Sequence, residues 1–180
     1  MLITNRNFTL SIENWNMKTW IGFLFLITIG FSTANAEEIL KGKVVNVIDG
    51  NTFELITEDN ETYKIMLFGV DSPELEQEFG EKAKKLLEKL LLNKNITAKI
   101  QGKDRKGTRL GITEANGATD ARVELLQAGL AWTAERNPIQ ELEVIREKAQ
   151  EKGKGLWKES EPTPPWIFRR QQSMLQPKSI

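Results

Sequence analysis

The stretch that decides the fold is Leu67-Phe68-Gly69-Val70-Asp71-Ser72-Pro73-Glu74. Its apolar run predicts a strand over residues 63–70, which ends before Pro73 because proline has no N–H for a strand ladder. Pro73 stiffens the turn and brings the carboxylates of Asp71 and Glu74 together at the end of the strand. Such a pair can hold a cation or move a proton. The alternative is an ordinary capped turn in which Glu74 is a surface charge.

Outward from this stretch, the spacing of apolar residues predicts five strands and three helices. The expected strands are residues 42–48, 52–56, 63–70, 96–100 and 110–113. The expected helices are residues 79–91, residues 121–128, and a third helix that Asn137 caps with Pro138 in its first position. Turns are expected at Asp49-Gly50-Asn51 and at Asn116-Gly117. This order of elements does not by itself name a fold.

The composition excludes several kinds of chemistry. The 180 residues include no histidine and no cysteine, so no Ser-His-Asp triad, thiolate nucleophile, disulfide or zinc finger can form. The 25 basic and 25 acidic side chains balance, which argues against a protein that coats nucleic acid through bulk charge. Any phosphate site is therefore expected to be local. With 39% hydrophobic residues and a mean hydropathy of −0.40, the chain is typical of a soluble globular protein.

Residues 1–36 are expected to be a signal peptide that is removed after export. The apolar run over residues 20–31 is short for a membrane span, and Ala34-Asn35-Ala36 offers a small-residue cleavage site. Met17, directly before Lys18, is a candidate for the true start. The alternative is a membrane anchor or a buried apolar helix. Cleavage predicts an exported protein, periplasmic or secreted, with no stable membrane insertion.

The rest of the chain is expected to form one domain over residues 37–160, followed by a Pro-rich tail over residues 161–180. The tail is expected to be a strap whose Trp166 and Phe168 pack on the domain surface. A polyproline recognition segment is the alternative.

Five short motifs follow one another in this chain in a fixed order. They are Val47-Ile48-Asp49-Gly50-Asn51-Thr52-Phe53, the stretch from Leu67 to Glu74, Phe79-Gly80-Glu81-Lys82-Ala83, Gly129-Leu130-Ala131-Trp132 and Gly155-Leu156-Trp157. Together they resemble the thermonuclease, or staphylococcal-nuclease-like, family over about residues 42–157. The ending Pro165-Trp166-Ile167-Phe168-Arg169-Arg170 resembles that of bacterial members. The resemblance implies a mainly β, α+β fold: a five-stranded OB-type Greek-key barrel with about three helices. In active members it implies a Ca²⁺-dependent phosphodiesterase that acts on DNA and RNA.

The resemblance assigns roles to several residues of this chain. Asp71 stands at the position of a direct metal ligand, Ser72 at that of a backbone carbonyl ligand, and Glu74 at that of the general base. Asn51 replaces a second metal-binding carboxylate but can still offer a neutral oxygen. Asp49 can help by direct ligation or through a water, or it can simply shape the turn. The resemblance therefore implies a Ca²⁺ site that is weakened or lost.

The two arginines that bind phosphate in the family are both replaced. Met66 and Thr108 stand at their positions, and Arg109 comes one residue late, which in a strand turns its side chain to the opposite face. Arg105, Lys106 and Arg109 are the candidate phosphate-binding residues of a basic segment over residues 99–109. An exposed β-turn is the alternative reading of this segment.

Three functional hypotheses follow. The preferred one is an exported nuclease-like domain that is catalytically impaired and retains a nucleic-acid-binding, phosphate-binding or scaffold role. The second is a working but divergent Ca²⁺-dependent endonuclease on single-stranded DNA or RNA, with the phosphate clamp rebuilt from Arg105, Lys106 or Arg109. The third is an extracytoplasmic protein-interaction domain that uses the Pro-rich tail and an unknown protein partner. A head group of Arg105, Lys106 or Arg109 within hydrogen-bond reach of a phosphate beside Asp71 would favour the enzyme over the other two.

Overall fold

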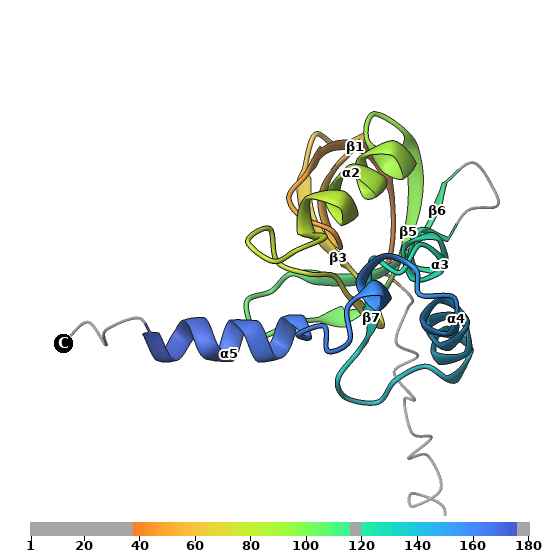
Figure 1. The fold of residues 1–180 in the computed structure, drawn as a ribbon. Coiled ribbons are helices and arrows are strands. Elements are labelled where there is room, and N and C mark those ends of the chain that lie inside the picture. The colour runs from red at the N-terminus through yellow and green to blue at the C-terminus, as the bar shows by residue number, and fades with distance from the viewer. Residues whose placement is uncertain (1–37, 116–119, 176–180) are drawn as a thin grey trace, which may run out of the picture. The chain divides into compact units, whose positions relative to one another are not determined.

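A closed barrel of five strands forms the centre of the fold (Figure 1). The computed structural model describes residues 38–115 and 120–175, which belong to one unit spanning Glu37–Ile180. The barrel strands are β1 (Glu38–Val47), β2 (Thr52–Thr57), β3 (Thr62–Leu67), β5 (Asn95–Lys103) and β6 (Arg109–Ala115). They are arranged in the order β1-β2-β3-β6-β5, and all pairs are antiparallel except β3 with β6. The predicted five-stranded barrel is confirmed. The predicted signal peptide and the Asn116-Gly117 turn lie outside the described residues.

The barrel interior is filled by side chains that alternate along the strands. Phe53 and Leu55 of β2 and Ile65 and Leu67 of β3 are at most 1% exposed, as the two-residue period of a strand requires. In β1 a bulge between Val44 and Asn46 interrupts this alternation. The bulge leaves Val45 exposed although it lies within an apolar run.

The strand predicted over residues 63–70 is two strands. β3 ends at Leu67, and Gly69 turns the chain with a φ of +84°, a left-handed value that favours glycine. The chain then forms β4 (Val70–Asp71), which pairs with β7 (Trp132–Thr133) in a separate two-stranded sheet. Asp71 therefore lies outside the barrel ladder, opposite Trp132.

The structure has four α-helices in the described residues, one more than predicted. They are α2 (Gly80–Leu91), α3 (Ala121–Gln127), α4 (Gln140–Glu151) and α5 (Pro165–Leu175), with a short 3₁₀ helix η1 (Gly155–Lys158) before the last. Helix α2 buries Ala83, Leu87 and Leu91 in the core, which confirms its predicted apolar face. None of the described helices is long and apolar enough to cross a membrane.

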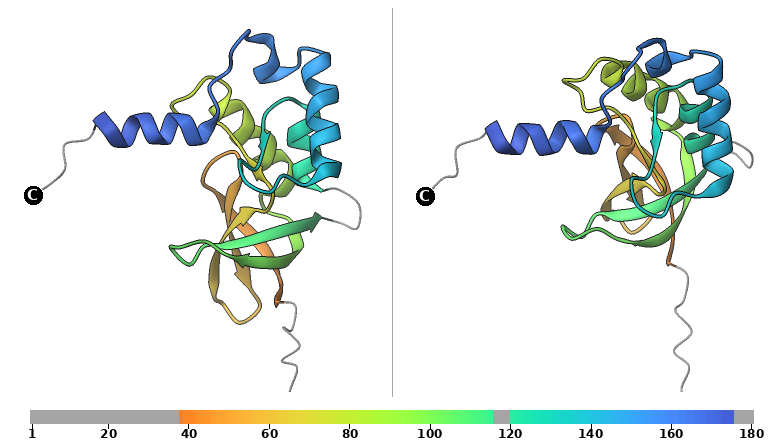
Figure 2. Two further views of the ribbon diagram at one scale, coloured as in Figure 1. Left: turned by 90° about the horizontal axis from the view of Figure 1, so that it is seen from below. Right: turned by 60° about the horizontal axis from the view of Figure 1, so that its bottom comes forward.

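One detail of the helical prediction was wrong, and one helix was not predicted. Asn137 is not an N-cap: its φ is +52°, and α4 begins at Gln140 after Ile139. The tail, predicted to be a strap, forms α5 from Pro165, whose fixed φ suits the first turn of a helix, and its Trp166 packs on Trp132 as the strap prediction expected. Figures 1 and 2 show that α5 runs away from the barrel, whereas α2, α3 and α4 lie against the rest of the domain.

Two glycine motifs meet at one backbone contact. The N–H of Leu156 donates to the carbonyl of Gly129 at 2.9 Å. A Cβ on Gly129 would lie 2.2 Å from the carbonyl oxygen of Lys154, and a Cβ on Gly155 would lie 2.2 Å from the carbonyl oxygen of Gly129. Only glycine permits this close approach, which joins the segment after α3 to η1.

Candidate active site

The stretch after β4 forms a tight loop that presents two acidic side chains. Ser72 and Pro73 are buried, whereas the side chains of Asp71 and Glu74 are 19% and 30% exposed. The loop closes on itself, because a Cβ on Gly80 would lie 2.0 Å from the carbonyl oxygen of Glu74. The two carboxylates are therefore held at the surface by buried neighbours.

The turn between β1 and β2 is fastened to the same loop. The Asp49 carboxylate accepts a hydrogen bond from the N–H of Asn51 at 3.0 Å. The Asn51 side chain is buried; its Nδ2 donates to the carbonyl of Val70 at 3.2 Å, and its Oδ1 accepts from the hydroxyl of Thr52 at 3.3 Å. In this structure the amide thus ties the turn to the strand that carries Asp71.

An arginine from α5 joins the two carboxylates. Nη1 of Arg169 lies 2.7 Å from Oε1 of Glu74 and 3.2 Å from Oδ1 of Asp71, and its Nη2 lies 2.7 Å from Oδ2 of Asp71. One guanidinium can reach both groups only if they converge on one point. No sequence motif predicted that Arg169 belongs to the site. The ending Pro165–Arg170, which contains it, indicated only a resemblance to bacterial members of the family.

Charges in this cluster act on one another. Burial raises the pKa of Asp71, and the hydrogen bonds from Arg169 oppose that rise. The negative charges of Glu74 and Asp49 add to the rise, which shows that all three acids lie within electrostatic reach. The pKa of Arg169 is raised, chiefly by its hydrogen bonds to Asp71. The guanidinium therefore offsets a local excess of negative charge.

The positions of the two family arginines carry no charge. Met66 lies on β3 with Thr52 and Leu110 as its strand partners. Thr108 lies in the turn between β5 and β6, where its N–H donates to the Asp104 carboxylate at 2.8 Å. Neither side chain can replace a guanidinium on a phosphate.

The basic segment over residues 99–109 is mostly paired with acids. Lys99 lies 2.8 Å from Glu114, and Lys103 lies 3.5 Å from Glu38. Arg109 also binds Glu38, at 2.5 Å, and its guanidinium stacks over the ring of Tyr63. Arg105 and Lys106 lie exposed in the turn between β5 and β6. Phosphate binding by Arg105, Lys106 and Arg109 stays a prediction, and the side chain of Arg109 is already engaged.

The donor chemistry of the cluster fits a hard cation such as Ca²⁺, held weakly. Its ligands would be the Asp71 carboxylate and the Ser72 carbonyl, with Asn51 Oδ1 and Asp49 able to add oxygens; Ca²⁺ prefers such ligands, six to eight in number. The buried hydroxyl of Ser72 has no hydrogen-bond partner. Within the described part of the chain, no three acidic side chains are grouped closely enough to hold a metal by themselves. Water would have to complete the coordination.

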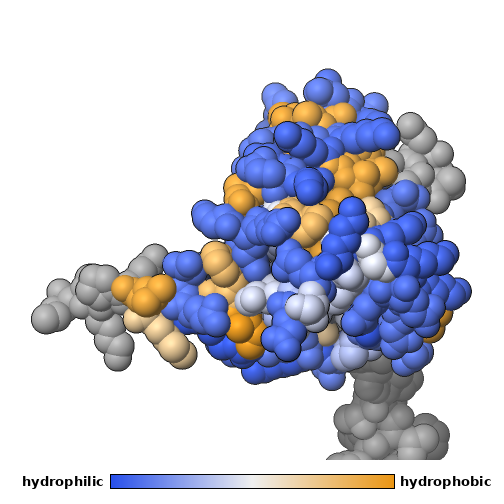
Figure 3. All heavy atoms as spheres, in the orientation of Figure 1, coloured by the Kyte–Doolittle hydropathy of each residue, from blue (hydrophilic) through white to orange (hydrophobic). Residues whose placement is uncertain are grey.

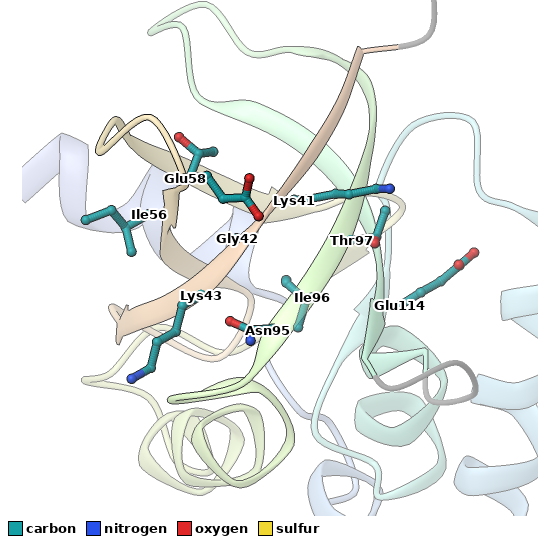
Figure 4. A pocket seen from close by; sticks show the side chains of 10 residues that line it. Lys41, Gly42, Lys43, Ile56, Glu58, Asn95, Ile96, Thr97 and Glu114 are labelled. Carbon is teal, nitrogen blue, oxygen red and sulfur yellow. The ribbon is translucent and has the colours of Figure 1, made fainter.

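Two hollows on the surface are candidate locations for the site. One of about 400 Å³ lies beside the cluster and is lined by Glu74, Glu76, Phe168, Arg169, Gln172 and Ser173. Another of about 600 Å³ lies across β1, β2 and β5, and Figure 4 shows its lining of mixed charge, with Lys41, Lys43, Glu58 and Glu114. No predicted site residue lines the second hollow, so we place the candidate site at the first.

A closed five-stranded barrel with a carboxylate-centred cluster at one end defines the molecule as an OB-like barrel protein. Residues 64–159 match the model of the family described as staphylococcal nuclease homologue. The chain belongs to the staphylococcal nuclease family, as the motifs predicted.

Curated relatives support the same assignment. An uncharacterized endonuclease of Haemophilus influenzae is 32% identical over 160 residues, covering 88% of this chain and 89% of that protein. An uncharacterized endonuclease of Escherichia coli O157:H7 is 32% identical over 131 residues, covering 72% of this chain and 85% of that protein. A micrococcal nuclease of Shigella flexneri is 28% identical over 142 residues, covering 72% and 80%.

Proposed function

We propose that this chain is an exported, Ca²⁺-dependent phosphodiesterase of reduced activity that binds and slowly hydrolyses single-stranded DNA or RNA. The observation that carries this proposal is the convergence of Asp71 and Glu74 on one guanidinium, each at 2.7 Å. A cation-binding carboxylate and a proton-accepting carboxylate at one point are the minimum for metal-assisted hydrolysis. The names of the relatives agree with a nuclease.

Each residue of the cluster has a role in this proposal. Asp71 and the Ser72 carbonyl hold the cation, which when bound supplies positive charge to the phosphate as its negative charge grows. Glu74 accepts a proton from the attacking water, whose oxygen bonds to phosphorus while the bond from phosphorus to the leaving sugar oxygen breaks. The leaving oxygen takes a proton from solvent.

Reduced activity is supported by three substitutions. The amide of Asn51 contributes no charge and is already hydrogen-bonded to Val70 and Thr52. Met66 and Thr108 provide no cation. One preorganised donor is worth about 10²- to 10³-fold in rate, so these losses predict turnover far below that of a complete site.

The test is hydrolysis of heat-denatured DNA by the purified protein in millimolar Ca²⁺ and in EDTA, with Glu74→Gln alongside. Slow cleavage that needs both Ca²⁺ and Glu74 supports the proposal. Binding of single-stranded DNA without any cleavage would instead support the binding role alone. Cleavage that survives in Glu74→Gln would contradict the assignment of the base. Export is tested separately, by the N-terminal sequence of the mature protein, which should begin at Glu37.

A further inference from the structure

The guanidinium of Arg169 is fixed at the carboxylate cluster but open to solvent. It donates three hydrogen bonds to Asp71 and Glu74, whereas a guanidinium has five N–H donors. Its side chain is 49% exposed and lines the hollow of about 400 Å³ beside Glu74. An anion that enters this hollow would therefore meet an arginine next to the two carboxylates.

The start of α5 is positioned by contacts to the elements that carry the cluster. Trp166 packs edge-on against Trp132 with ring centroids 5.8 Å apart, and Trp132 is the strand partner of Asp71. Residues three apart share one face of a helix, so the packing of Trp166 directs Arg169 toward Asp71. The aromatic contact thus connects the orientation of α5 to β4.

A second connection runs through the loop itself. The side-chain carbonyl of Gln77 accepts from the N–H of Glu74 at 3.0 Å, and its amide donates to the carbonyl of Thr163 at 2.9 Å. Arg170 adds an ion pair to Glu135 at 2.9 Å. The Gln77 side chain therefore links the segment before α5 to the loop that carries Glu74. This link fixes the position from which Arg169 reaches the cluster.

We propose that Arg169 is the phosphate-binding arginine of this site, supplied by the C-terminal helix in place of the two missing from the barrel. The assignment presupposes the phosphodiesterase function proposed above. A cation held by Asp71 would repel the guanidinium, and a phosphate beside that cation would attract it. Arg169 would then exchange its bond to Asp71 for hydrogen bonds to the phosphate oxygens, which the two N–H donors of a guanidinium can bind as a pair. Among the ion pairs of the described residues, no other lysine or arginine meets Asp71 or Glu74.

The experiment compares Arg169→Gln and Arg169→Lys with Arg136→Gln, which removes the same charge from an exposed arginine outside α5. Ca²⁺ binding is measured by calorimetry, and binding of a phosphorothioate single-stranded oligonucleotide, which resists hydrolysis, by fluorescence anisotropy in Ca²⁺. Arg169→Gln should bind Ca²⁺ more tightly, because a competing cation is gone. It should bind the oligonucleotide about 10- to 100-fold more weakly, the range of one charge-assisted hydrogen bond.

Hydrolysis should fall about 10²-fold or more in Arg169→Gln and recover in part in Arg169→Lys. Arg136→Gln should stay within about twofold on every readout. Urea unfolding of each variant checks that it folds, which is expected for Arg169 because its side chain is half-exposed.

Three outcomes would overturn the assignment. Faster hydrolysis in Arg169→Gln would make the contact an inhibitory latch, and equal losses in Arg169→Gln and Arg136→Gln would make the effect one of net charge alone. A wild-type protein that binds no oligonucleotide would remove the assignment together with the proposed function. If the wild type binds but does not cleave, and Arg169→Gln alone loses binding, the assignment stands and the proposed hydrolysis fails.

Discussion

Asn51→Asp restores the carboxylate that the family resemblance expects, and the structure predicts that its effect on stability depends on Ca²⁺. The Asn51 side chain is 5% exposed, and its Nδ2 donates to the carbonyl of Val70. A carboxylate at this position cannot donate, so an acceptor would face an acceptor.

The magnitude follows from that contact. Loss of the hydrogen bond costs about 1 kcal/mol, and a buried acceptor left without a donor costs about 1–3 kcal/mol more. Asn51→Asp should therefore lower the free energy of unfolding by about 2–4 kcal/mol in EDTA. In saturating Ca²⁺ each tenfold gain in Ca²⁺ affinity returns about 1.4 kcal/mol, because the ligand binds only the folded state. The deficit should shrink or change sign.

The assay is urea unfolding of wild type and Asn51→Asp, each in EDTA and in millimolar Ca²⁺. Asn95→Asp is the matched control, since Asn95 is exposed on β5 and its strand partner on β1 is Lys43. It should change stability by about 0.5 kcal/mol or less and respond to Ca²⁺ as the wild type does. If Asn51→Asp matches the wild type in EDTA, the amide does not fasten the turn to β4. If Ca²⁺ stabilises both proteins equally, residue 51 does not contribute to the cation site.

Two further predictions concern the scaffold. Gly129→Ala should lower the free energy of unfolding by about 3 kcal/mol or more, because a φ of +68° strains alanine and the new Cβ would lie 2.2 Å from a backbone oxygen. Gly107→Ala, with a φ of +84° and open space, should cost only the strain of about 1–2 kcal/mol, and a similar loss in both would refute the overlap. For Glu143, burial alone would raise the pKa, but hydrogen bonds from Thr133 and Arg146 outweigh it and lower the pKa below 4.5. The ionised form of Glu143 then stabilises the fold above pH 4.5, and this contribution is lost as the pH falls through the lowered pKa. The difference in the free energy of unfolding between wild type and Glu143→Gln should therefore become smaller in acid. A difference that does not change with pH would contradict this.

The barrel strands were predictable from their apolar runs, for example Phe53 and Leu55, which flank the less buried Glu54. The closed barrel itself was implied only by the family resemblance, because the order of elements does not name a fold. The end of β3 before Gly69 was not predictable, because the residues on both sides of Gly69 are apolar. A glycine inside such a run is compatible with either a continuous strand or a turn. Helix α5 was not predicted, because Pro162 and Pro164 next to Pro165 favour an extended chain over a helix start.

The candidate site likewise has a part that the sequence could predict and a part that it could not. Asp71 and Glu74 are three positions apart, so a proline-stiffened turn suffices to bring them together. Arg169 is 98 positions from Asp71 and reaches it through tertiary contacts such as the packing of Trp166 on Trp132, which no local pattern encodes. The motif positions alone therefore do not reveal every charged residue of a substituted site, because other parts of the fold can supply some of them.

Supplying the arginine from α5 makes the charge of the site depend on how firmly that helix is docked. Its first turns contact the domain through Trp166, Arg169 and Arg170, whereas Met174 and Leu175 are 80% and 77% exposed. Figure 3 shows apolar surface at this far end of α5, as well as over the upper part of the molecule. The ion pairs that hold the helix are half-exposed, and such pairs are worth about 0–1 kcal/mol and weaken in salt. Rising salt should therefore reduce turnover more steeply than the screening of phosphate contacts alone, because it also loosens the arrangement that places Arg169 beside Asp71.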